Sequence, residues 1–126
     1  MAANTSPIFV NAVRCQTASL TTGSATLQTL FDPGAEGSRV DSVKLVADAT
    51  TTAARFQILV NDGTNDRIIH DGLVAPLTAS STVAAWSTSV SLGILLEADD
   101  TLKVRLVSGA FTSGADLDVV AYGGDY

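Results

Sequence analysis

Apolar and polar side chains alternate along almost the whole chain, and this period of two constrains the fold more than any other feature of the sequence. In the segment DTLKVRLVS, Leu102, Val104 and Leu106 share one face. The residues between them, Lys103 and Arg105, share the other. Successive side chains of a strand point to opposite faces, so this alternation indicates strands with one buried side. The chain is therefore predicted to be all-β.

Eight segments show this alternation, with turn residues such as Pro33 and Gly34 between them. They span residues 7–15, 25–31, 39–49, 55–61, 66–74, 83–94, 100–108 and 115–123. A break is expected at Asp71-Gly72, inside one of them. A chain of 126 residues fits one domain. The predicted fold is a single-domain antiparallel β-sandwich of about eight strands, jelly-roll-like in topology, over residues 8–126, preceded by an arm at 1–7.

The charge pattern excludes two classes of partner. The net charge is −6, and the seven basic residues are scattered along the chain. Nucleic acids and anionic membranes both require clustered basic side chains, so neither is expected as a partner. The first residues, MAANTSPIF, lack the features of a signal peptide, which predicts synthesis in the cytoplasm. The single cysteine, Cys15, is expected to be a small buried residue of a strand.

The polar loop Asn61 to Asp66 is the first candidate site. Its oxygen-rich side chains suggest a cation loop, but no glycine follows in the place that an EF-hand requires, and the next glutamate is Glu97. The dipeptide Asp62-Gly63 is instead typical of a hairpin, because glycine accepts a positive φ angle. A tight turn is favoured, and cation binding by Asp62 and Asp66 stays open.

The remaining polar candidates also favour structural roles. The acidic stretch 97–100 is expected to form a turn between strands. Asp116 and Asp118 share a strand face, which is either solvated or a cation site. His70 is the only histidine, and Trp86 is expected in the core or in an interface. No catalytic residues, cofactor site or metal site are assigned, and no enzymatic activity is expected.

Several stretches give the chain a resemblance to a known group of proteins. They are ANTSPIF near the start, FDPGAEGSRVDSV (31–43), RFQILVNDGTNDRII (55–69), LLEADDTLKVRL (95–106) and VVAYGGDY (119–126). With these, the chain resembles small all-β structural proteins of tailed-bacteriophage virions. The resemblance implies a capsid decoration (cement) protein that binds the outer head surface and stabilises the particle. The alternative is a carbohydrate-binding or host-adhesion module of a phage fibre or tail accessory.

The resemblance also implies partners, namely the major capsid protein and further copies of the chain in a homo-oligomer, with a trimer as the expected state. The predicted arm offers candidate contact residues because its small polar side chains have few apolar atoms to bury in a core. These residues are Ala2, Ala3, Asn4, Thr5, Ser6 and Pro7. The expected location is the capsid surface of the virion.

Overall fold

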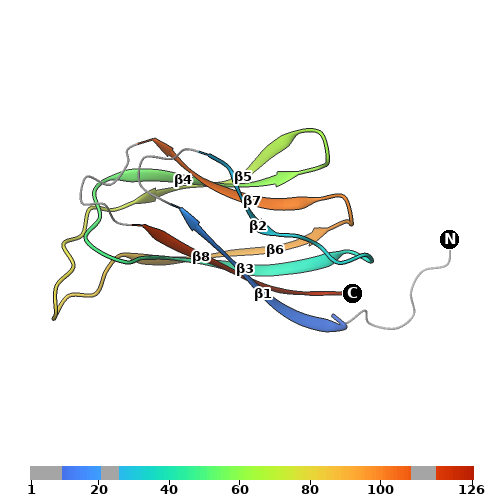
Figure 1. Cartoon of the computed structure of the whole chain (residues 1–126), viewed down its shortest axis with the longest axis horizontal. Coiled ribbons are helices and arrows are strands. Elements are labelled where there is room, and N and C mark those ends of the chain that lie inside the picture. The colour runs from blue at the N-terminus through green and yellow to red at the C-terminus, as the bar shows by residue number, and fades with distance from the viewer. Residues whose placement is uncertain (1–9, 21–25, 109–115) are drawn as a thin grey trace.

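Eight strands form two four-stranded antiparallel sheets that pack face to face (Figure 1). The computed structural model describes residues 10–20, 26–108 and 116–126. The strands are β1 (Ala12–Leu20), β2 (Gln28–Phe31), β3 (Ser38–Ala47), β4 (Ala54–Asn61), β5 (Asp66–Val74), β6 (Ser87–Leu96), β7 (Thr101–Ser108) and β8 (Leu117–Asp125). Within the described part of the chain no helix is long and apolar enough to cross a membrane.

The strand order is that of a jelly roll. Sheet A has the order β1-β8-β3-β6 and sheet B the order β2-β7-β4-β5. Successive strands largely alternate between the sheets, and the first and last strands, β1 and β8, pair with each other in sheet A. Both features are expected for a jelly roll built from two Greek keys. The predicted all-β, jelly-roll-like sandwich is confirmed.

The core lies between the inner faces of the two sheets. The alternation predicted for the strands holds here, since Val43 and Leu45 of β3 are fully buried while Lys44 between them is exposed. The largest fully buried side chains come from both sheets: Leu20, Leu30, Phe31, Val40, Val43, Leu45, Phe56, Ile58, Val74, Leu102 and Leu117. They form one continuous apolar cluster, which makes the sandwich a single body.

The first strand differs from the prediction. β1 begins at Ala12 and runs to Leu20, whereas 7–15 was expected; residues 7–9 lie outside the described part. Pairing with β8 decides the position, from Ala12 opposite Asp125 to Leu20 opposite Leu117. The apolar residues before Arg14 suggested an earlier strand. The inward side chains of Arg14 and Gln16 near the start of β1 are polar, so apolar content did not mark where this strand begins.

The expected burial of Cys15 is wrong. The cysteine is in a strand as predicted, but it is exposed. Its partner in the β1–β8 pair is Tyr122, which points away from the core. Because paired residues of an antiparallel ladder project to the same face, Cys15 points outward with it.

The expected break at Asp71-Gly72 is also wrong, since β5 continues through it to Val74. Gly72 lies opposite Phe56, and a Cβ atom at Gly72 would lie 2.5 Å from the ring. The glycine therefore makes room for a core side chain instead of ending the strand. Other boundaries shift by a few residues: β6 begins at Ser87 instead of 83, and β8 continues to Asp125.

The predicted arm, with its candidate contact residues at 2–7, lies outside the described residues. Its contacts remain a prediction. The described chain starts at Val10, whose Cγ1 atom occupies the place where a Cβ of Gly124 would lie. Gly124 pairs with Val13, which is 90% exposed, so Val10 lies over the outer face of sheet A.

Candidate functional site

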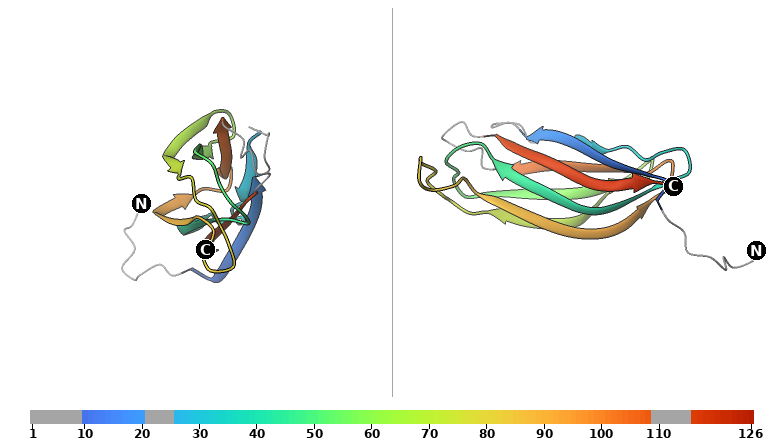
Figure 2. Two further views of the ribbon diagram at one scale, coloured as in Figure 1. Left: turned by 90° about the vertical axis from the view of Figure 1, so that its left-hand side faces the viewer. Right: turned by 90° about the horizontal axis from the view of Figure 1, so that it is seen from below.

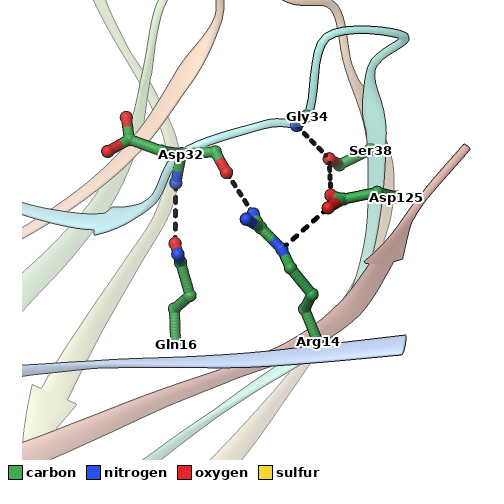
Figure 3. Close-up of polar contacts among 6 residues, drawn as sticks. All are labelled: Arg14, Gln16, Asp32, Gly34, Ser38 and Asp125. Carbon is green, nitrogen blue, oxygen red and sulfur yellow. Dashed lines mark hydrogen bonds and ion pairs between the residues drawn. The ribbon is translucent and has the colours of Figure 1, made fainter. Parts of the chain in front are cut away.

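A polar network closes the flank of the sandwich where β1 and β2 meet (Figure 3). Arg14 projects from β1 between the sheets, and its Nε lies 3.2 Å from Oδ2 of Asp125, an ion-pair contact. The hydroxyl of Ser38 donates a hydrogen bond of 2.5 Å to Oδ1 of the same carboxylate. Ser38 is fully buried, so this bond satisfies a hydroxyl that water does not reach. The network therefore joins β1, β3 and β8.

The same network holds the loop that follows β2. The guanidinium of Arg14 donates to the carbonyl oxygen of Asp32, and the N–H of Asp32 donates to Oε1 of Gln16 at 2.8 Å. The N–H of Gly34 donates to Oγ of Ser38 at 2.9 Å. A Cβ at Gly34 would lie 2.9 Å from the carboxyl carbon of Asp125, so glycine is required for this packing. The loop after β2, a strand of sheet B, is thereby fixed to β1, β3 and β8 of sheet A.

Arg14 also packs against the core. Its guanidinium carbon lies 4.4 Å from the centre of the Phe31 ring, a cation–π contact. The pair of Arg14 and Asp125 is partly buried, with side chains 28% and 22% exposed. Such a pair is screened less by solvent than a surface ion pair. These groups support the fold, since the guanidinium of Arg14 is held by a hydrogen bond to Asp32, an ion-pair contact with Asp125 and the ring of Phe31.

The outer face of sheet A carries a hollow beside this network. The hollow has a volume of about 370 Å³, and its lining includes Val13, Cys15, Tyr122 and Asp41. Val13 is 90% exposed and Tyr122 43%. We call Val13, Cys15 and Tyr122 the sheet A patch. It lies next to Val10, where the described chain starts, so an apolar surface adjoins the predicted arm.

The opposite flank, between β5 and β6, is open. Figure 2 (left) shows β1 and β2 together on one side of the molecule and β5 and β6 on the other. A groove of about 420 Å³ runs between β5 and β6, lined in part by His70, Leu73, Thr88 and Ser89. Leu73 is 78% exposed. This flank therefore exposes apolar surface beside a groove.

The loop at 61–66 forms the predicted turn. The N–H of Asp62 donates to the carbonyl of Asn65, and Gly63 has a φ of +95°. The carboxylate of Asp62 accepts the N–H groups of Asn65 and Thr64 at 2.8 and 3.0 Å. These hydrogen bonds hold the pKa of Asp62 below its ordinary value, because they favour the charged carboxylate. This carboxylate oxygen is engaged in holding the turn.

The other candidates are placed as follows. The stretch 97–100 forms the predicted turn, in which Oδ2 of Asp100 accepts the N–H of Glu97 at 2.9 Å. Asp118 lies in β8, as predicted, whereas Asp116 lies one residue before the strand begins. The N–H of Asp116 donates to a carboxylate oxygen of Asp48 at 2.9 Å. In the described ranges, no group of three or more His, Cys, Asp or Glu side chains has an arrangement suited to a metal ion.

The two remaining candidates, His70 and Trp86, both lie close to Phe56. The His70 ring centre is 5.6 Å from that of Phe56, and the Trp86 ring centre is 6.2 Å from it. Trp86 is half-buried against the core, as predicted, so its ring is only partly available to a ligand.

Sequence reasoning missed the network of Arg14, Ser38 and Asp125. No local signal marked it. The apolar Val13 and Cys15 on either side of Arg14 suggest that the arginine points outward, whereas the structure exposes both neighbours and turns Arg14 inward. Its partner Asp125 lies more than 100 residues away and was not visible in the sequence.

Comparisons with known proteins leave the family open. No protein-family model matches the chain, and no curated protein does. A solved structure described as Eiger TNF from S. frugiperda is similar over 87% of this chain and 92% of its own, with 9% sequence identity and a TM-score of 0.43. The jelly-roll assignment rests on the strand order of this chain.

Proposed function

We propose that this protein is a structural component of a tailed-phage virion, a capsid decoration protein that binds the outer head surface as a homo-oligomer. It acts without enzymatic chemistry, as a rigid body that adds contacts between capsid subunits. The proposal continues the resemblance to phage virion proteins carried by the stretches at 31–43, 55–69 and 95–106.

The observation that carries the proposal is the sheet A patch. Val13, Cys15 and Tyr122 are exposed side by side on adjacent strands of one sheet face. Exposed apolar groups that adjoin one another mark contact surfaces more often than single exposed residues do. The patch also adjoins Val10, so an arm and a sheet face would contact a partner together.

The closed flank supports a mechanical role. Arg14 and Asp125 fix the first and last strands and the loop after β2 to one another. A surface that bridges subunits gains affinity when it is already rigid, because less conformational entropy is lost on docking. The patch is built on these same two strands, so its geometry is set before any partner binds.

Binding to purified expanded heads tests the proposal. The wild-type chain is expected to co-sediment with heads of its phage. Val13→Asp should weaken that binding by at least about tenfold, since a charge at the centre of the contact loses its hydration there. Ser19→Asp on the same outer face of β1 is the matched control and should bind as wild type. A wild-type chain that ignores heads would contradict the proposal, and so would equal binding by all three proteins.

A carbohydrate-binding module is the second candidate, and one observation favours it. Tyr122 lies at the hollow on sheet A together with the carboxylate of Asp41, and sugars bind through a ring face and hydrogen-bonding side groups. Screening the protein against immobilised glycans separates the two. Glycan binding lost in Tyr122→Ala, with no binding to heads, would replace the decoration proposal.

A further inference from the structure

The free edge of β6 is the least protected sheet edge in the described molecule. Its sequence, STSVSLGILL, contains no charged side chain and no proline. Within the described ranges it pairs with β3 alone, and the pairing is regular from Ser87 to Ser91. Proteins usually protect such an edge with charges, proline, bulges or short length, because its unpaired N–H and C=O groups otherwise pair with another chain.

The three other edge strands show these protections. β1 carries the inward-pointing Arg14 and contacts β2 across the closed flank, and β2 has only four residues. β5 carries the charged side chains of Asp66, Arg67 and Asp71. The pairings of β5 and β6 with their neighbours each contain one register shift, so the absence of charged side chains is what distinguishes β6 from β5 on the open flank. This difference indicates an edge that is available for pairing.

The inner side of β6 is also incompletely covered. Thr88 and Leu92 face inward but are half-exposed, whereas Val43 and Leu45 of the neighbouring β3 are fully buried. The groove of about 420 Å³ lies along this same stretch of β6. A strand added beside β6 would pair its free backbone groups and cover these side chains together, which is the usual form of strand addition.

We infer that the free edge of β6 at Ser87–Leu92 takes up residues 1–9 of a second copy as an added strand. The occupant is chosen by composition and length. Its sequence, MAANTSPIF, has no charged side chain, which matches the uncharged edge. Nine residues span about 30 Å when extended, and six residues of edge require about 20 Å.

The position of Val10 favours a second copy over the same chain. Val10 lies over Gly124 in β8, and β3 separates β8 from β6 in the sheet. The segment would use about 10 Å or more crossing its own sheet, at about 4.8 Å for each strand, before it reached its own β6. What remains is close to the length of the edge or shorter. A neighbour placed beside β1 requires no such crossing, so the full segment is available for pairing.

Cross-linking between two full-length chains tests the contact. One chain carries Cys15→Ser and Thr5→Cys, and the other carries Cys15→Ser and Ser89→Cys. With a short bismaleimide, the mixture should give a cross-linked pair containing one of each chain, identified by mass spectrometry. The matched control replaces Ser89→Cys by Ser19→Cys on the exposed face of β1. Equal yield with the control overturns the inference. So does cross-linking confined to single molecules when one chain carries both Thr5→Cys and Ser89→Cys.

Two lysine variants of the full-length chain give an independent test. Thr88→Lys places a charge in the groove beside the edge, and Ser87→Lys places one on the outer face of the same strand. Sedimentation should show self-association weakened at least about tenfold by the first and little changed by the second. Melting temperatures establish that both variants are folded. Equal self-association of folded Thr88→Lys and Ser87→Lys would overturn the inference.

The inference rests on the proposed self-association and not on the head surface, so the two fail separately. If the β6 cross-link forms and the protein ignores heads, the decoration function falls and the strand contact stands. If the protein loads onto heads while the cross-link and the lysine variants show no role for β6, the strand contact falls and the function stands.

Discussion

The two flanks of the sandwich differ in how the edge strands of the two sheets meet. At the closed flank, β1 and β2 contact one another, and Arg14 fills the space between them with bonds to Asp125 and Asp32. At the open flank, β5 and β6 contact each other little, and a groove lies between them. A flank closed by its own side chains contributes stability, and a flank left open offers unpaired backbone to another chain. The comparison assigns stability to one side and association to the other.

The largest expected loss of stability comes from crowding β8, the strand that pairs with β1 at the closed flank. A Cβ atom at Gly123 of β8 would lie 2.0 Å from the carbonyl oxygen of Arg39, a backbone atom that cannot turn aside. Gly123→Ala should therefore cost about 3 kcal/mol of unfolding free energy, measured by urea denaturation.

Gly93 of β6 is the matched position near the open flank. A Cβ there meets nothing within 4 Å, and only its φ of +60° resists substitution. Gly93→Ala should cost about 1 kcal/mol. Equal losses in the free energy of unfolding for the two substitutions would contradict the tighter packing described for β8 at Gly123 than for β6 at Gly93.

The next effect tests the network itself. Arg14→Ala removes the ion pair with Asp125, the hydrogen bond to Asp32 and the contact with the Phe31 ring. We expect a loss of about 2–3 kcal/mol in the free energy of unfolding, because the partners keep their partial burial without their cation.

Arg39→Ala is the control for Arg14→Ala. Its ion pair with Asp41 is more exposed, with side chains 42% and 53% accessible, and should contribute less than about 1 kcal/mol. Equal losses for the two arginines would show that the closed flank is no better stabilised than the surface.

The smallest effect concerns the turn that joins β4 to β5 on the open-flank side. The folded pKa of Asp62 lies below its unfolded value of about 3.9, so its contribution is present above that pH and disappears as pH falls through the folded pKa. Asp62→Ala should melt below wild type at pH 6, and the difference should vanish in strong acid.

Asp62→Asn keeps an acceptor oxygen for the turn and should melt close to wild type. Calcium should leave the melting temperature of both proteins unchanged. A rise with calcium that is lost in Asp62→Asn would instead support the cation loop that the sequence left open.

The sequence predicted local features well and long-range pairing poorly. Alternation correctly placed Leu102, Val104 and Leu106 inside, and Asp62-Gly63 marked a real turn. Both are set by neighbours in the chain. The exposure of Cys15 is set by its pairing with Tyr122, which follows from the register of β1 against β8. No signal within either segment fixes that register.

The same limit explains the error at Gly72 and the missed network. A glycine after an aspartate normally suggests a turn, but Gly72 is required by the Phe56 ring on the next strand. Arg14 was visible as an inward residue only once β1 was placed. Sites built from strands that are adjacent in space and distant in sequence cannot be assembled from local patterns.

Amide hydrogen exchange of the full-length chain, measured over a range of protein concentrations, tests the division between the flanks most directly. As the chain self-associates, those amides between Ser87 and Leu92 of β6 that point away from β3 should gain protection, because an added strand accepts their free N–H groups. The amides of β1 from Ala12 to Leu20 should change little in comparison. Protection that grows in β1 while β6 stays unchanged would contradict the account, and would place the contact between copies on the closed flank.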